Sequence, residues 1–537
     1  MGILLPGRCG MESFRHSAYA AADLEAPSCP LTADFGPRCS SEALNTTMTV
    51  PLTILRRRLP IWPIAVLWTL ALGLWGLSRQ HSVWRDEAAT WQVAQRSTAD
   101  IWHMLENVDV VHGLYYFLMH EVFACFGAGT TVLRLPSVLA TAVAAACTAV
   151  LGHRLAGFWA GLGAGLAFGL LPAVQFYLQE GRSYALVAAG AGISTLLLVT
   201  MLKGHDRAMR WAAYGGTVLV CGLLNWLSLL ILPAHAATLI WSRTPRRLCI
   251  RWVVTSSAAL VGVLPLMVFS RGQSDQVSWI PPLTWHMMIG PAVLLAIGGL
   301  GAVADRPRAG RLSAAAVGLP LLAVPQIGLI GISLVQPLFL DRYILFSMVG
   351  LALLIGAGLG AAVQAATPRY PRASAWLVPV LVAVAAAALL PQSLAKRSPA
   401  SRVDDVLAIA EDVQRLKRTG ESVLFVPAAR RDTKLVSPGA FTGLRDIALA
   451  TSPQKSGTLK GEEADPARIR AAMLSQRRIL LVTDAPEVAT PVSAQRDIMK
   501  LSVLKKYFTA VADEQVRGRR VTVYERIRPS TGLPQAP

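Results

Sequence analysis

The sequence predicts an α-helical polytopic membrane protein with a small α/β domain at its C-terminal end. Of its 537 residues, 53% are hydrophobic and only 15% are charged, whereas a soluble domain carries roughly 25% charged residues. The apolar residues are grouped: between Ile61 and Pro391 they form successive runs, each near the ~20 residues that a bilayer span requires. After Pro391 the composition becomes that of an ordinary soluble domain.

The positive charge of the chain indicates topology. Much of the net charge of +19 lies in short clusters between apolar runs, such as Arg56–Arg58 and Arg246-Arg247. Basic residues near span ends are retained in the cytoplasm, so nucleic-acid binding is not expected. The seven cysteines follow neither a disulfide framework nor a zinc spacing.

Apolar runs and basic clusters together predict eleven spans, with the N-terminus in the cytoplasm and the C-terminus outside. The first follows three arginines and is expected to be an uncleaved anchor. The stretch 113–127 is short, contains His120-Glu121 and carries two tyrosines, so we expect it to lie in the interface. The predicted spans are 61–78, 133–152, 158–178, 183–202, 211–226, 228–242, 252–270, 287–303, 313–335, 344–364 and 375–391.

Three regions are expected along the chain. Residues 1–55 mix Pro, Gly, Ser and Cys without an apolar period and are predicted to be a disordered cytoplasmic tail. Residues 56–391 form the transmembrane domain, with a first outer loop at 79–132. Residues 392–537 are expected to form an extracytoplasmic α/β domain.

Within the C-terminal domain the pattern predicts one helix and three strands. Residues 403–417 have a helical period, and 422–427 and 478–484 are typical of buried strands. Residues 520–526 alternate like an edge or half-buried strand. The sequence leaves open whether this domain recognises an acceptor or covers an outer cavity.

Polar residues other than Arg and Lys gather on the predicted outer side. They lie in the segments 84–92, 106–116, 179–185, 271–285 and 340–346. The inner side holds short basic turns and little else. One end of the helix bundle is therefore expected to carry the chemistry.

The segment WRDEAATWQ places two carboxylates, Asp86 and Glu87, directly after the first span. Trp84 and Trp91 would hold this segment at the membrane interface. A carboxylate held there and partly desolvated can act as a general base on a hydroxyl or amine. We predict that both acids are catalytic; the competing explanation is a solvated loop start.

Two arginines at the outer boundary run against the positive-inside tendency. Arg182 lies in QEGRSYA and Arg342 in LDRYILF. A guanidinium can bind phosphate with two parallel hydrogen bonds, so both residues are predicted to bind a phosphate. The alternative for Arg182 is a local ion pair with Glu180.

The same side carries two histidines, His103 and His112. A lone histidine is more often structural than catalytic, and no H-x-x-x-H or H-E-x-x-H pair supports a metal. Asp109 and His112 could supply one ligand pair at most. His112 is kept as a site candidate.

These segments together resemble the superfamily C (GT-C) membrane glycosyltransferases. The nearest branch holds the protein O-mannosyltransferases and the lipid A aminoarabinose transferases, particularly its actinobacterial mannosyltransferase members. The resemblance rests on WRDEA after the first span, DVVHGLYYFLMHEVFACFG, LRLPSVLATAVAAACTAVLGHRLAG, LPAVQFYLQEGRSYAL and LDRYILF. It covers about residues 60–390 and is specific over 79–185. Many relatives have Pro-Pro where this chain has His112-Gly113.

The resemblance implies transfer of a sugar from a polyprenyl phosphate to an extracytoplasmic protein, lipoglycan or glycan of the cell envelope. Asp86 corresponds to the catalytic acid of the first outer loop and Glu87 to its neighbour, while Arg182 and Arg342 match positions suited to the donor phosphate. Mannose is the expected sugar, with arabinofuranose as the alternative, and inverting displacement is the expected mechanism. Further predicted substrate contacts are Asp109, His112, Tyr115, Glu180, Asp341 and Tyr343.

Some members of the wider superfamily use a divalent cation. Here Mg²⁺ or Mn²⁺ would have Asp86, Glu87 and Asp109 as ligands, which are fewer oxygens than such ions usually gather, so no metal is assigned. A transporter is the alternative from another class. Against it, the spans contain almost no acidic residues and the polar groups gather on one face. A third hypothesis is a non-catalytic membrane scaffold that presents the C-terminal domain.

Overall fold

The computed structural model describes residues 60–273, 279–305 and 310–527. The predicted tail at 1–55 lies outside these residues. So do parts of the outer segment 271–285 and of the basic cluster at 305–311.

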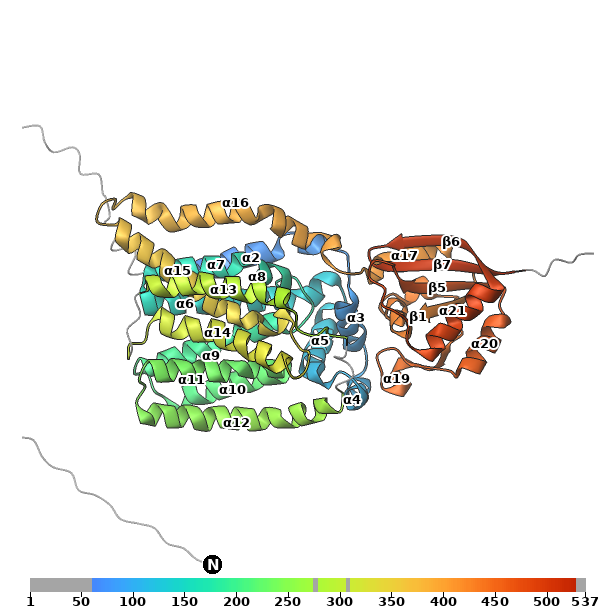
Figure 1. Ribbon diagram of the computed structural model, residues 1–537, viewed down its shortest axis with the longest axis horizontal. Helices are drawn as coiled ribbons and strands as arrows, with labels where there is room; N and C mark the ends of the chain where they lie inside the picture. The colour runs from blue at the N-terminus through green and yellow to red at the C-terminus, as the bar shows by residue number, and fades with distance from the viewer. Residues whose placement is uncertain (1–59, 274–278, 306–309, 528–537) are drawn as a thin grey trace, which may run out of the picture. The chain divides into compact units, whose positions relative to one another are not determined.

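The fold is a bundle of apolar helices followed by a small mixed sheet domain (Figure 1). Each of the eleven predicted spans contains a helix. These helices are α2 (Trp62–Leu74), α6 (Thr130–Ala156), α7 (Phe158–Leu170), α9 (Tyr184–Leu202), α10 (Ala208–Leu224), α11 (Ile231–Trp241), α12 (Arg246–Arg271), α13 (Ile289–Ala304), α14 (Ala314–Ser333), α15 (Met348–Ala366) and α16 (Leu377–Arg397). Within the described part of the chain, seven helices are long and apolar enough to cross a membrane.

Two predicted spans end earlier than expected. Helix α2 stops at Leu74, because Gly76 follows in a left-handed conformation with φ 74°, where glycine is favoured. The span predicted at 158–178 contains two helices, since α7 ends at Leu170 and Pro172 opens the short helix α8 (Pro172–Tyr177). Proline fits the first turn of a helix but not its interior.

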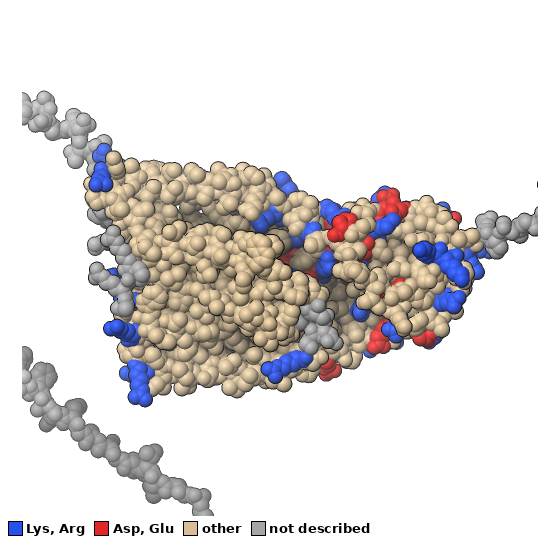
Figure 2. Space-filling view, viewed as in Figure 1, with Lys and Arg blue, Asp and Glu red and all other residues tan. Residues whose placement is uncertain are grey.

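The outer helices present apolar side chains to their surroundings. Large exposed hydrophobic residues lie on α12, α13 and α16, among them Val254, Val261, Val268, Leu300, Val303 and Val384. Figure 2 shows a broad uncharged surface over the bundle, with lysine and arginine at its end. An apolar surface this large is not left in contact with water. The longer helices match the thickness of a bilayer, so lipid is the expected environment.

Inside the bundle the helices pack at small residues. A Cβ atom added to Gly356 of α15 would lie 2.3 Å from the Ala160 carbonyl oxygen of α7, and one added to Gly152 of α6 would lie 2.9 Å from Gly161. Close approach at small residues is the usual means of packing helices in membranes.

The basic turns meet at one end of the bundle. Arg154, in the last turn of α6, donates to Thr200 near the end of α9, and Arg251 of α12 pairs with Asp206 before α10 at 2.5 Å. The acidic loops lie at the opposite ends of these helices. The predicted orientation in the membrane stays a prediction.

The predicted first outer loop folds into short helices between α2 and α6. They are α3 (Arg85–Ala94), α4 (Thr98–Asn107), the 3-10 turn η2 (Val110–His112) and α5 (Gly113–Phe126). Ser97 caps α4 by accepting a hydrogen bond from the Asp100 amide at 3.1 Å, a typical N-cap. Helix α5 packs on α3, α4 and α6, and its interfacial location stays a prediction.

The C-terminal domain contains a five-stranded sheet in the order β2-β1-β5-β7-β6. Its strands are β1 (Ser422–Val426), β2 (Arg445–Asp446), β5 (Arg478–Asp484), β6 (Phe508–Val516) and β7 (Arg519–Arg526). Strand β1 pairs with β2 and β5 in parallel, whereas β7 is antiparallel to β5 and β6. Helix α17 (Val406–Leu416) covers one face, and α20 (Pro466–Leu474) and α21 (Gln495–Tyr507) cover the other (Figure 1).

The predicted buried strands at 422–427 and 478–484 are confirmed as β1 and β5. The strand predicted at 520–526 is confirmed as β7; of the two alternatives, the edge position is wrong, because β7 lies between β5 and β6, and its mixed burial fits a half-buried strand. The sequence did not predict β6, whose residues are mostly exposed or half-buried, so it lacks an apolar signal. A separate pair of short strands, β3 (Leu449–Thr451) and β4 (Glu462–Glu463), completes the domain.

Candidate active site

Asp86 and Arg342 form an ion pair at the end of the bundle opposite the basic turns. The Asp86 carboxylate, in the first turn of α3, lies 2.6 Å from Nη1 of Arg342. Arg342 belongs to the 3-10 segment η6 (Asp341–Ser347) that leads into α15. The two side chains are 21% and 12% exposed, so the pair is shielded but reachable from outside.

Three aromatic rings surround the Arg342 guanidinium. Its central carbon lies 5.9 Å from the ring of Tyr184, 5.7 Å from Trp279 and 5.8 Å from Tyr343, which suits cation–π attraction. The Nε atom of Arg342 is buried and has no hydrogen-bond partner among the described residues. Arg342 therefore retains a donor that an incoming anion could use.

Arg182 links α3 to η2. Its Nη1 donates to the Asp86 carbonyl oxygen at 3.3 Å, and its Nη2 lies 2.8 Å from Nε2 of His112. Arginine only donates, so Nε2 of His112 accepts and the ring is neutral. Burial and the adjacent charge of Arg182 lower the pKa of His112 well below its ordinary value, which agrees with a neutral ring. The alternative given for Arg182, a local ion pair with Glu180, does not occur among the described contacts.

Glu87 points into the protein interior. Its carboxylate accepts two hydrogen bonds from Arg134, at 2.8 and 2.6 Å, and one from the Gly181 amide at 2.9 Å. Both Glu87 and Arg134 are fully buried. Burial alone would raise the pKa of Glu87, but the charge and hydrogen bonds of Arg134 outweigh it and hold the pKa below its ordinary value. This geometry joins α3 to α6 and to the loop before α9.

Glu180 is a buried carboxyl beside the site. Neither of its oxygens has a hydrogen-bond partner within the described part of the chain. Burial raises the pKa of Glu180 to about 7, although the charge of Arg402 opposes this rise. Glu180 is therefore poised between its neutral and charged forms near neutral pH.

Replacing Glu180 with Gln is expected to stabilise the protein at pH 8 much more than at pH 5. The carboxyl ionises near 4.5 in the unfolded chain and near 7 in the folded chain. The folded state therefore keeps this proton to higher pH than the unfolded state does. The free energy of unfolding of the wild-type protein falls by up to about 3 kcal/mol as the pH rises from below 4.5 to above 7, and the Gln variant escapes this loss. Thermal midpoints of both proteins at the two pH values test this, with the exposed Glu106→Gln as control. A midpoint difference that does not change with pH would contradict it.

The other predicted residues are distributed around this centre. Asp109 accepts a hydrogen bond from Tyr116, and Asp341 accepts one from Tyr177 at 3.0 Å. Tyr115 is buried in the core, and its hydroxyl has no partner in the described structure. His103 is solvent-exposed 3.6 Å from Glu106. The residues gathered at the site are Asp86, His112, Glu180, Arg182, Asp341, Arg342 and Tyr343.

Sequence reasoning missed two residues that build the site. Arg134 is a single charge within an otherwise apolar run, and such a charge is itself a signal for a buried partner. Arg402 packs 3.8 Å from the centre of the Phe176 ring and donates to the carbonyl oxygens of Phe176 and Gln179 at 3.2 Å. It thereby holds the loop that carries Glu180, and no sequence pattern marks it.

Within the described ranges, the carboxylates do not gather as a cation site. Among the described residues no group of three or more Asp, Glu, His or Cys side chains gathers as metal ligands. Asp86 pairs with Arg342, Glu87 with Arg134, and Asp109 with the Tyr116 hydroxyl. The donor set that the sequence offered for Mg²⁺ or Mn²⁺ therefore does not fit such an ion.

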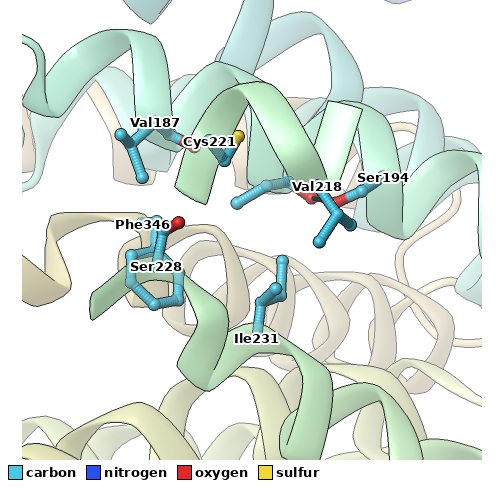
Figure 3. A pocket seen from close by; sticks show the side chains of 8 residues that line it. Val187, Ser194, Val218, Cys221, Ser228, Ile231 and Phe346 are labelled. Atoms are coloured by element: carbon cyan, nitrogen blue, oxygen red, sulfur yellow. Dashed lines mark hydrogen bonds between the residues drawn. The ribbon is translucent and has the colours of Figure 1, made fainter. Parts of the chain in front are cut away.

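A small cavity lies among α9, α10 and α11. Figure 3 shows Val187, Val218, Ile231 and Phe346 around it. Its volume is only about 10 Å³, with Ser194, Ser228 and Cys221 as its polar or sulfur-bearing neighbours. Ligand pockets usually span roughly 300–1,000 Å³, and no charged side chain lines this one. It is a packing gap in the bundle.

The described helices and sheet define a class by fold: polytopic helical membrane proteins with a small C-terminal sheet domain, which solved structures share. ArnT from Cupriavidus metallidurans in the apo state matches 86% of this chain and 97% of its own length, at a TM-score of 0.58 and 14% identity. The same protein bound to undecaprenyl phosphate is similar at a TM-score of 0.55 and 13% identity, over the same shares of both chains.

An oligosaccharyltransferase from Archaeoglobus fulgidus, tethered to an acceptor peptide, is similar at a TM-score of 0.49 and 12% identity, over 87% of this chain and 74% of its own. No protein-family model matches the chain, and no curated protein matches it. The fold is therefore shared with ArnT.

Proposed function

We propose that the chain is a membrane glycosyltransferase that moves a sugar from a polyprenyl-phosphate donor to an acceptor outside the cytoplasm. The observation that carries this proposal is the ion pair of Asp86 and Arg342. It sets a candidate base beside a candidate phosphate ligand where apolar helices meet polar loops. The fold shared with ArnT, including its undecaprenyl phosphate complex, supports a lipid-borne donor.

The ion pair suggests how the donor would engage. A phosphate at Arg342 would compete with Asp86 for the guanidinium, and the unpartnered Nε would supply a second hydrogen bond. Loss of its partner would free the Asp86 carboxylate to accept a proton. Donor binding would thus activate the base.

The reaction is then a direct inverting displacement. Asp86 takes the proton of the acceptor hydroxyl or amine while that atom attacks the anomeric carbon. The bond from the anomeric carbon to the phosphate oxygen breaks, and the leaving phosphate keeps the electron pair. Arg342 neutralises the developing charge, and Arg182 adds a second positive charge beside Asp86.

Glu87 is assigned a supporting role in this scheme. Its carboxylate is held by Arg134 and by the Gly181 amide in the part of the chain that the structure describes, so it orients the first turn of α3. Arg182, in the loop before α9, donates to the Asp86 carbonyl oxygen of the same turn, and His112 in turn holds Arg182. Asp341, Tyr343 and Glu180 complete the proposed substrate surroundings.

Mannose is the proposed sugar, on the resemblance of the 79–185 stretch to actinobacterial mannosyltransferases, and arabinofuranose is its alternative. The acceptor is a protein, lipoglycan or glycan of the cell envelope. The active end faces outward because the basic turns meet at the opposite end of the bundle. The C-terminal sheet domain then lies outside as well.

Arg342→Gln is expected to weaken donor binding by at least about tenfold, because it removes a charged hydrogen bond worth roughly 1.5–3 kcal/mol. Binding of a polyprenyl phosphate to the protein in nanodiscs measures this directly. Arg271→Gln, an exposed arginine at the end of α12, is the matched control and should bind like wild type.

The phosphate itself is tested by comparing polyprenyl phosphate with polyprenyl alcohol. Wild type should prefer the phosphate, and Arg342→Gln should lose most of that preference. Equal binding of both lipids by wild type, or an unchanged preference in Arg342→Gln, would remove Arg342 from the site.

A further inference from the structure

Helix α3, which carries Asp86, does not cap its own N-terminus. Trp84 occupies the N-cap position and makes no capping hydrogen bond in the described structure. Instead, the Arg85 amide donates to Oδ1 of Asp404 at 3.0 Å. Asp404 lies 319 residues further along the chain, in the segment between α16 and α17. A carboxylate there also complements the positive end of the helix dipole.

Asp404 is fixed by the core of the C-terminal domain. Its Oδ2 accepts from Nε of Arg519 at 3.0 Å, and Arg519 also makes two bonds to Asp432, at 2.9 and 2.7 Å. Asp404 and Arg519 are fully buried. Because Arg519 begins β7 and Asp432 begins α18 (Asp432–Val436), the capping oxygen is tied to the central sheet.

The same domain holds α3 at further points. The Val406 amide donates to the Val83 carbonyl oxygen at 2.8 Å, just before α3. Beyond the other end of the helix, Nη2 of Arg96 donates to the Thr458 carbonyl oxygen at 2.9 Å. Between them Val83 and Ala88 pack in one apolar cluster with Val406 and Val436. Both ends of α3 are therefore attached to the C-terminal domain.

We propose that the C-terminal domain braces the active site, with Asp404 as a positioning residue for the helix that carries Asp86. This inference rests on the proposed function. Asp86 directly follows the capped residue, so loss of the cap displaces its carboxylate from Arg342. Small displacements of a reacting group reduce rates by about a hundredfold, while donor binding, centred on Arg342, is largely spared.

The test compares Asp404→Ala and Asp404→Asn in the full chain in nanodiscs, with Asp513→Asn as control. Asp513 forms an exposed ion pair with Arg520 in the same domain. Hydrogen exchange of the peptide covering 83–92 should be about tenfold faster in Asp404→Ala. Asp404→Asn keeps a capping oxygen and should restore most of the protection, and Asp513→Asn should match wild type. Transfer by Asp404→Ala should show a lower kcat with an almost unchanged KM for the donor.

Unchanged exchange over 83–92 in a folded Asp404→Ala would overturn the brace. If that variant does not fold, Arg96→Gln decides: faster exchange over 90–96 with a lower kcat supports the brace, and wild-type exchange overturns it. Because exchange is measured without substrate, it separates the two proposals. If Asp404→Ala exchanges faster but the wild-type protein transfers no sugar, the proposed function is refuted and the structural brace stands.

Discussion

Asp86→Asn is expected to lower the rate of sugar transfer by about a thousandfold, since a positioned general base contributes roughly 10²–10⁴-fold. Asn is isosteric but cannot take the acceptor proton. Donor affinity should stay the same or rise a few-fold, because the phosphate no longer competes with a carboxylate for Arg342. Transfer kinetics and lipid binding on one nanodisc preparation give both quantities.

The matched control for this prediction is Glu106→Gln, an exposed acid on α4 in the same loop. It should transfer and bind like wild type. Near-normal transfer by Asp86→Asn would rule out Asp86 as the base. Loss of donor binding together with transfer would instead make Asp86 part of the binding surface.

Glu87→Gln is expected to produce the largest loss of stability, about 3–5 kcal/mol, as found when one partner of a buried ion pair is removed. Arg134 would keep its charge at a fully buried position without a counter-ion. Replacing both residues with Met should recover much of the loss, because the uncompensated charge disappears. Thermal unfolding followed by tryptophan fluorescence measures the series.

Asp513→Asn again serves as the reference, because exposed pairs contribute at most about 1 kcal/mol. Equal midpoints for Glu87→Gln and Asp513→Asn would show that the buried pair does not hold the loop. A stable Glu87→Gln that no longer transfers sugar would make Glu87 a reacting group and overturn its supporting role.

The membrane part of the fold follows from simple physical signals. Runs of apolar residues and basic turns predicted eleven spans, and each of these segments contains a helix, because length and hydropathy mark the segments that suit lipid. Seven helices of the described residues are long and apolar enough to cross a membrane. Local breaks such as Gly76 and Pro172 shifted helix ends. Strand β6 went undetected because its pairing with β7, not its own composition, makes it a strand.

The site was predictable in part. Asp86, Arg182 and Arg342 stand out as charges at a membrane boundary, and the structure brings them together. The sequence could not separate Asp86 from Glu87, because adjacent residues on a helix face different directions and only tertiary contacts reveal which is buried. Arg134, Arg402 and Asp404 act through partners 47 or more residues away, so their roles need the fold.

The most direct test of the account is sugar transfer by the full chain in lipid nanodiscs. Radiolabelled polyprenyl-phosphate-mannose and polyprenyl-phosphate-arabinofuranose are each supplied with membrane extract as the acceptor source. The account predicts that one of the two loses its label to a non-lipid product with wild type but not with Asp86→Asn. Failure of wild type to bind either lipid or to release label from it would contradict a polyprenyl-phosphate-dependent transferase.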